Sequence, residues 1–134
     1  MTDSDGALAA NRTFYRAFSE RDVALMDALW AVQAPVLCIH PGWPPLIGRA
    51  AVLHSWHGIL NNAMAPKIVF HEGRPLVHAG LILVVGNEII GDALLVATNG
   101  FVVEDRQWRL VFHQAGHQVT EIEDPTALPR GPLH

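Results

Sequence analysis

The stretch LILVVGNEIIGDALLVATNGFVVEDRQWRLVFHQA, residues 81–115, decides the fold. Three runs within it are rich in β-branched, aliphatic and aromatic residues and are predicted to be strands: 81–90, 93–103 and 107–115. The connections between them, Gly91-Asp92 and Glu104-Asp105-Arg106, have the composition of hairpin loops. Strands joined by successive hairpins predict an antiparallel, curved sheet.

Helical patterns come before this sheet. Apolar residues recur at a helical period over 8–18, with acidic residues ahead of them that suit a helix start. Asp22 is placed to cap a second helix that ends before Pro35, and an apolar stripe predicts a third helix over 49–62. Helices first and strands afterwards predict an α+β domain.

Shorter segments join these elements. Residues 36–40 form a short β-rich run, and 41–48 carry three prolines and two glycines, so a stiff loop without regular structure is predicted there. Two further β-rich runs, 67–71 and 76–78, extend the sheet. No linker divides the chain, so residues 1–134 are predicted to be one domain, with 119–134 as a proline-containing extension outside the core.

The central strands are apolar on both faces. Residues 81–85 and 94–97 do not alternate with polar residues, and such strands are covered on both sides. The helices can cover only one side. We therefore predict that a second copy covers the outer sheet face and that the protein is a homodimer.

Composition excludes several kinds of partner. The net charge is −4, and no run of Lys or Arg is present, which argues against nucleic acid. No apolar stretch approaches the roughly 20 residues needed to cross a bilayer, so no membrane partner is expected. Cys38 is the only cysteine, and the start of the sequence lacks the pattern of a secretory signal, so the cytoplasm is the expected compartment.

His40 is the first candidate for chemistry. Imidazole titrates near neutrality, so it can exchange a proton without a large environmental shift. In a strand over 36–40, His40 shares a face with Val36 and Cys38, which would direct it into a pocket. The alternative is a structural histidine that bonds the backbone beside Pro41.

Gln114 and Asn99 are amides in otherwise apolar strands. Strict alternation places Gln114 on the face of Leu110 and Phe112, and Asn99 on the face of Leu95, Ala97 and Phe101. A buried amide needs partners, which a ligand, a water or neighbouring backbone can supply. Gln114 is predicted to assist His40, and Asn99 to contact the ligand.

Aromatic side chains supply flat apolar surfaces for a ring-bearing ligand. Tyr15, Trp56 and Phe101 are candidates for the pocket wall, although most such residues form core. Trp43, in the proline-rich loop beside His40, is predicted to be a lid or wall. The pairs His54/His57 and His113/His117 lack the further ligands of a zinc site, so neither a metal nor another cofactor is predicted.

Four segments occur in an order typical of one superfamily: Phe18-Ser-Glu-Arg-Asp22, Ile39-His-Pro-Gly42, Gly48-Arg-Ala-Ala-Val52 with Trp56, and Gln107-Trp-Arg-Leu-Val-Phe-His113. Over about residues 8–116 the chain resembles the nuclear transport factor 2-like superfamily, in its SnoaL-like branch related to ketosteroid isomerase. The resemblance implies a cystatin-like cone, in which a curved, mainly antiparallel sheet wraps around about three helices, with an apolar pocket and commonly a homodimer.

The resemblance also places residues. His40 stands where the isomerase relatives carry a general-base aspartate, and Phe14 stands where they carry a tyrosine that holds the oxyanion. Phenylalanine has no donor, so an oxyanion cannot be held at that position. Two hypotheses stay open: a protein that binds a hydrophobic or ring-bearing metabolite with acid/base chemistry by His40, or a non-catalytic dimerisation or ligand-sensing module.

Overall fold

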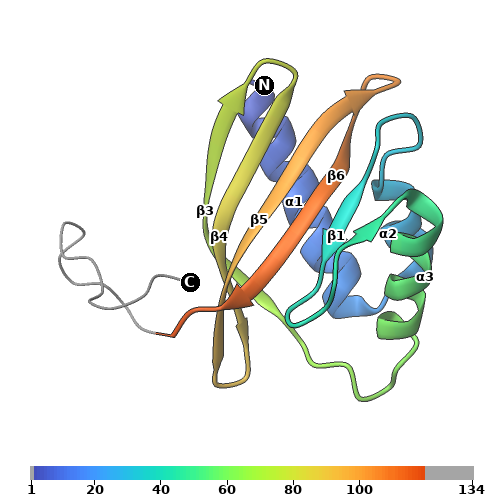
Figure 1. The fold of residues 1–134 in the computed structure, drawn as a ribbon. Coiled ribbons are helices and arrows are strands. Elements are labelled where there is room, and N and C mark those ends of the chain that lie inside the picture. Colours follow the sequence, from blue (N-terminus) through green and yellow to red (C-terminus); the bar gives the residue numbers. More distant parts are fainter. Residues whose placement is uncertain (1, 120–134) are drawn as a thin grey trace, which may run out of the picture.

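The computed structural model describes residues 2–119. The chain forms the elements α1 (Asp3–Glu20), α2 (Val23–Leu29), β1 (Leu37–Ile39), β2 (Leu46–Ile47), α3 (Arg49–Leu60), β3 (Val69–His78), β4 (Leu81–Ile90), β5 (Ala93–Glu104) and β6 (Gln107–His117). Three helices and a curved sheet make an α+β cone, as predicted (Figure 1). No helix among these residues is long and apolar enough to span a membrane.

The six strands form one mixed sheet in the order β2-β1-β6-β5-β4-β3. The strands β3 to β6 pair antiparallel, whereas β1 pairs parallel with β6. The sheet stays open, with β2 and β3 at its edges, and α1 lies across one face of it while α2 and α3 stand beside β1 (Figure 1). The cone therefore has a helical side and a bare outer side.

Two segments differ from their predictions. The loop 41–48 was predicted to lack regular structure, but Leu46–Ile47 pairs with β1. All three prolines of the loop precede this pair, so Leu46 and Ile47 keep their backbone donors. The runs 67–71 and 76–78 were predicted as separate strands, but residues 69–78 form one strand, β3, which has an irregular register between His71 and Arg74. The predicted extension 119–134 lies, apart from Val119, outside the described residues.

Local chemistry fixes both N-terminal helices. Thr2 caps α1: its hydroxyl accepts from the Asp5 backbone while the Asp5 side chain accepts from the Thr2 backbone, so the helix starts earlier than its apolar period. Arg21 ends α1 in the left-handed conformation, and Asp22 caps α2 as predicted by accepting from the backbone of Leu25.

A bulge in β6 decides which residues face the interior. Gly100 pairs with Phe112 and Phe101 pairs with Leu110, so Val111 has no partner in β5. An extra residue exchanges the two faces of a strand beyond it. Leu110 and His113 therefore both point inward, and the prediction that Gln114 shares the inner face with Leu110 is wrong.

Candidate functional site

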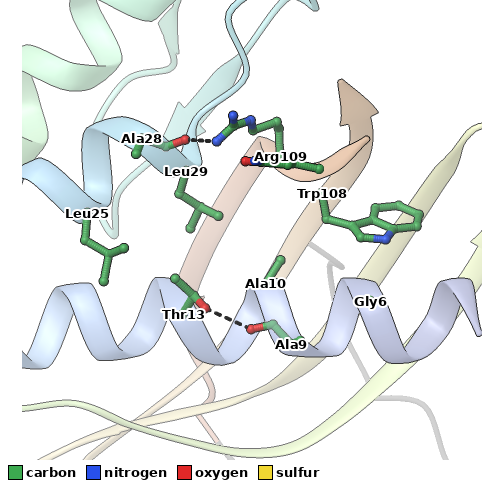
Figure 2. Close-up of a pocket in the computed structure, with 10 residues that line it drawn as sticks. Gly6, Ala9, Ala10, Thr13, Leu25, Ala28, Leu29, Trp108 and Arg109 are labelled. Carbon is green, nitrogen blue, oxygen red and sulfur yellow. Dashed lines mark hydrogen bonds between the residues drawn. The ribbon is translucent and has the colours of Figure 1, made fainter. Parts of the chain in front are cut away.

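Two hollows in the described residues could hold a small molecule. A groove of about 430 Å³ runs between α1, α2 and the start of β6 (Figure 2). A second cavity of about 580 Å³ lies between the β1–β2 connection and α3, and its lining includes Trp43, Leu46, Ser55 and Ile59. Of the predicted site residues, only Trp43 lines either of them.

His40 lies directly behind the larger cavity. It is 4% exposed, on the same face as buried Cys38, and its ring packs edge-on against Trp43 and Trp56 with centroids 4.9 Å away in each case. Its Nε2 lies 3.0 Å from Oγ of Ser55, which lines the cavity. The Ser55 hydroxyl thus connects the cavity to the imidazole.

The hydrogen bonds fix the tautomer of His40. The single proton of the Ser55 hydroxyl is donated to the carbonyl of Val52 at 2.7 Å, so Ser55 Oγ accepts from His40 Nε2. Nδ1 is then the nitrogen without a proton, and it has no hydrogen-bond partner among residues 2–119. Burial lowers the pKa of His40 to about 4, so the ring is neutral at pH 7.

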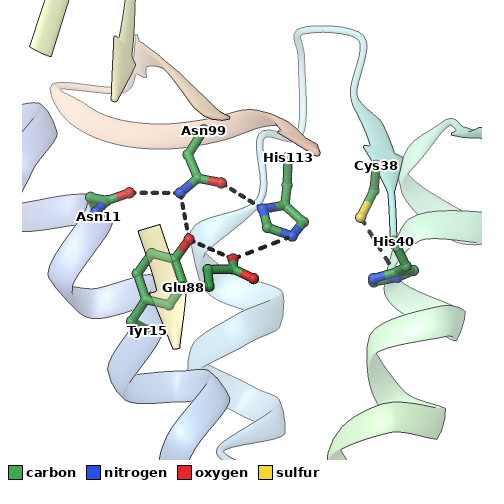
Figure 3. Close-up of polar contacts among 7 residues, drawn as sticks. All are labelled: Asn11, Tyr15, Cys38, His40, Glu88, Asn99 and His113. Carbon is green, nitrogen blue, oxygen red and sulfur yellow. Dashed lines mark hydrogen bonds and ion pairs between the residues drawn. The ribbon is translucent and has the colours of Figure 1, made fainter. Parts of the chain in front are cut away.

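A network of buried polar side chains fills the cone beyond His40 (Figure 3). The amide of Asn99 donates to Asn11 Oδ1 at 2.9 Å and to the Tyr15 hydroxyl at 3.0 Å. Tyr15 in turn donates to Oε2 of Glu88 at 2.7 Å. The amide oxygen of Asn99 is left to accept from His113 Nδ1 at 2.5 Å.

The network holds a buried acid beside a buried base. Nε2 of His113 is its unprotonated nitrogen and lies 3.9 Å from Oε2 of Glu88, too far for a hydrogen bond. Burial raises the pKa of Glu88, against the opposing effect of the Tyr15 hydroxyl. Burial, and then the positive charge that His40 can carry, lower the pKa of His113 to about 3. Both shifts favour the neutral forms.

The predicted residues divide into three groups. Asn99 faces inward as predicted, and its partners are protein side chains. Tyr15, Trp56 and Phe101 are core residues, at most 6% exposed, whereas Trp43 is 47% exposed at the cavity wall. Gln114 is exposed on the outer face, away from both His40 and the cavity.

Asn11, Glu88 and His113 are the members of the network that sequence reasoning missed. Glu88 is the one charged residue in the strand 81–90. Alternation places it on the same face as Ile82, Val84 and Ile90, so its burial could have been predicted from the sequence. His113 could not be placed by alternation because the bulge at Val111 reverses the faces. Together they make the interior of the cone polar where the pattern predicts only apolar packing.

The thiol of Cys38 adds no nucleophile to the site. It is fully buried and lies 3.7 Å from Nε2 of His40. Burial raises its pKa to about 12, so the thiolate is absent at pH 7. The arrangement suits ligand binding and proton exchange by neutral groups.

The sequence and the fold both resemble those of known proteins. A model of the SnoaL-like domain matches residues 7–118. A candidate dehydratase of the NTF2-like family from Streptomyces avermitilis is 28% identical, with a TM-score of 0.81 over 88% of this chain and 97% of that one. No curated protein matches the sequence.

Two further solved structures share the architecture. A candidate calcium/calmodulin-dependent protein kinase type II association domain from Thiobacillus denitrificans is 31% identical, with a TM-score of 0.73 over 83% of this chain and 94% of that one. An NTF2-like protein from Cytophaga hutchinsonii, 14% identical with a TM-score of 0.73 over 88% of this chain and all of that one, shares the fold. By its sequence match and its fold, this chain belongs to the SnoaL-like domain family of the nuclear transport factor 2-like superfamily.

Proposed function

We propose that the protein binds a small, mainly apolar metabolite in the cavity between the β1–β2 connection and α3, and that His40 accepts a proton from it through Ser55. For this transfer the ring proton lies on Nδ1 and the Ser55 hydroxyl turns from Val52 to Nε2, so that Ser55 passes its own proton to His40 and receives one from the ligand. The observation that carries this proposal is the hydrogen bond between Ser55, in the cavity wall, and the neutral imidazole of His40. None of the residues that line the cavity is an Asp, Glu, Lys or Arg, which favours an uncharged ligand.

The pKa of His40 limits the chemistry. A pKa of about 4 lies three units below neutral pH, so a free imidazolium would cost about 4 kcal/mol at pH 7. His40 is therefore a neutral but weak base at pH 7, which suits it to polarising a ligand hydroxyl or to accepting a proton transiently from an activated carbon. Elimination of water is one reaction of this kind, and the Streptomyces avermitilis relative is described as a candidate dehydratase.

A thermal-shift screen with neutral ring-bearing alcohols and ketones tests the proposal. A ligand at a hundredfold excess over its Kd stabilises the native state by about 2.7 kcal/mol. The stabilisation should disappear in Gly58→Leu, because Gly58 lines the cavity and no atom lies within 4 Å of the position a Cβ would take. It should weaken in His40→Gln and Ser55→Ala.

Ser19→Ala is the matched control. Ser19 also donates its hydroxyl to a backbone carbonyl, that of Ile68 at 2.8 Å, but it does not line the cavity. This variant should bind the hit like wild type. A hit that binds Gly58→Leu and His40→Gln as tightly as wild type would show that the ligand lies elsewhere. A hit that these variants weaken, but that wild type does not convert to a product, would leave a ligand-sensing module.

We also propose that a second copy covers the outer sheet face. Cross-strand neighbours share a face, and the register aligns five apolar residues on this side that are 38–59% exposed: Val69, Leu76, Ile89, Leu94 and Val96. The 31% identical relative from Thiobacillus denitrificans is described as an association domain, which agrees with self-association.

Light scattering coupled to size exclusion tests this dimer. Wild type should give about twice the monomer mass of 14.7 kDa, and Val96→Glu, which places a charge on the outer face, should give the monomer mass. Val77→Glu is the control, since Val77 is exposed but pairs with inward-facing Ile82. A monomeric wild type would refute the dimer.

A further inference from the structure

Figure 2 shows the groove between α1, α2 and β6. It is separate from the His40 cavity, since no residue lines both. Its floor is a strip of small residues on α1, which includes Gly6, Ala9 and Ala10. Leu25 and Leu29 of α2 form one wall, and Trp108 and Arg109 of β6 form the other. The groove of about 430 Å³ is large enough for a bicyclic ligand.

Gly6 lets the indole of Trp108 lie directly against α1. A Cβ at this position would come within 2.2 Å of Nε1 of Trp108. The contact with Gly6 places one flat ring at the end of the groove. The indole N–H of this ring has no hydrogen-bond partner among residues 2–119. An aromatic ligand can pack against such a ring.

Arg109 supplies the charge at the rim. One Nη of its guanidinium donates to the carbonyl of Ala28, and the remaining N–H groups have no hydrogen-bond partner within the described residues. No Asp or Glu lines the groove. The carboxylate that Arg109 influences, Glu104, is already bound by three backbone N–H groups of residues 32–34, at 2.6–3.0 Å. The rim therefore has unpaired guanidinium N–H donors and no carboxylate.

We propose that this groove is a second ligand site, which takes an aromatic carboxylate. The ring lies between the leucines of α2 and Trp108, and the carboxylate pairs with the free edge of the Arg109 guanidinium. A planar guanidinium pairs with a carboxylate through two parallel hydrogen bonds, so it selects this anion over a neutral amide.

An NMR titration of the ¹⁵N-labelled protein with indole-3-acetate tests the site, with indole-3-acetamide as the uncharged probe. Indole-3-acetate should shift the amide signals of Gly6 and Ala10 and the indole N–H of Trp108. Indole-3-acetamide should bind at least roughly tenfold more weakly, since it lacks the negative charge that pairs with Arg109. No shifts up to about 5 mM indole-3-acetate would overturn the proposal.

Variants separate the groove from other sites. Arg109→Gln should weaken indole-3-acetate by roughly tenfold or more, and Gly6→Ala, which displaces Trp108, should abolish its shifts. Arg12→Gln, which removes an exposed arginine of the same helix outside the groove, should bind within about twofold of wild type. The spectrum of each variant is first compared with that of wild type, so that a loss of binding can be distinguished from a loss of folding.

Two results would refute the assignment. Shifts confined to Ser55 and Trp43 would place the ligand in the His40 cavity instead. Equal affinity of wild type and Arg109→Gln, or of the acid and its amide, would show that no carboxylate is recognised.

Discussion

The two buried histidines should make the protein sensitive to mild acid, and His113→Gln should remove a defined part of that sensitivity. In the folded state the pKa of His113 is lowered from 6.5 to about 3, because it is buried and faces His40. The unfolded chain binds a proton at this residue below about pH 6.5, and the folded chain does not. Stability is therefore lost as the pH falls from 6.5 toward 3.

The size of the loss follows from the two pKa values. At pH 5 the unfolded state gains about 2 kcal/mol from protonation of one histidine with a pKa of 6.5, while at pH 7.5 it gains almost nothing. His40, with a pKa of about 4, adds a similar amount. Glu88, whose pKa is raised, acts in the opposite sense, since its contribution is lost as the pH rises through that raised value.

Urea unfolding of wild type and His113→Gln at pH 7.5 and pH 5 isolates the contribution of His113, because the other titratable groups contribute to the pH dependence of both proteins. Between these pH values, wild type should lose about 2 kcal/mol more stability than the variant. Glutamine keeps a donor for Asn99, so the variant retains the network bond. Leu110→Val, in the same strand, is the control and should lower stability equally at both pH values.

An equal pH dependence of wild type and His113→Gln would refute the reasoning. It would mean that His113 is protonated in the folded state at pH 5, and hence that solvent reaches the network.

Three further predictions concern the scaffold. Asn99→Ala should cost about 3 kcal/mol or more in urea unfolding, because it removes three buried hydrogen bonds and leaves Asn11 and His113 without their partner; a loss below about 1 kcal/mol would show that water replaces the amide. Gly86→Ala should lower the melting temperature, since its Cβ would lie 2.5 Å from the Phe70 ring and 2.8 Å from a backbone carbonyl; an unchanged value would contradict this packing. Glu104→Gln should destabilise the 32–34 loop at pH 7, and hydrogen exchange there should show a difference from wild type that shrinks as the pH falls through the lowered pKa of Glu104; equal exchange at pH 7 would exclude the contact.

Much of the fold follows from local sequence patterns. The hairpins at Gly91 and Asp105 and the cap at Asp22 depend on neighbouring residues alone, so turn chemistry and periodicity predict them. The inward face of Asn99 also follows from alternation within β5. The order of helices and strands then indicates the α+β class, and the order of four short segments resembles that of the superfamily.

The site depended on contacts between residues far apart in the sequence. The bulge that places His113 inside and Gln114 outside exists only in the pairing of β6 with β5, so the sequence of β6 alone does not indicate it. The bond from Tyr15 to Glu88 joins residues 73 positions apart, and that from His40 to Ser55 joins the residue after β1 to α3. The sequence by itself determined the elements and their order, because those follow from local chemistry; only the tertiary structure decided which polar groups meet, because burial and long-range packing set that.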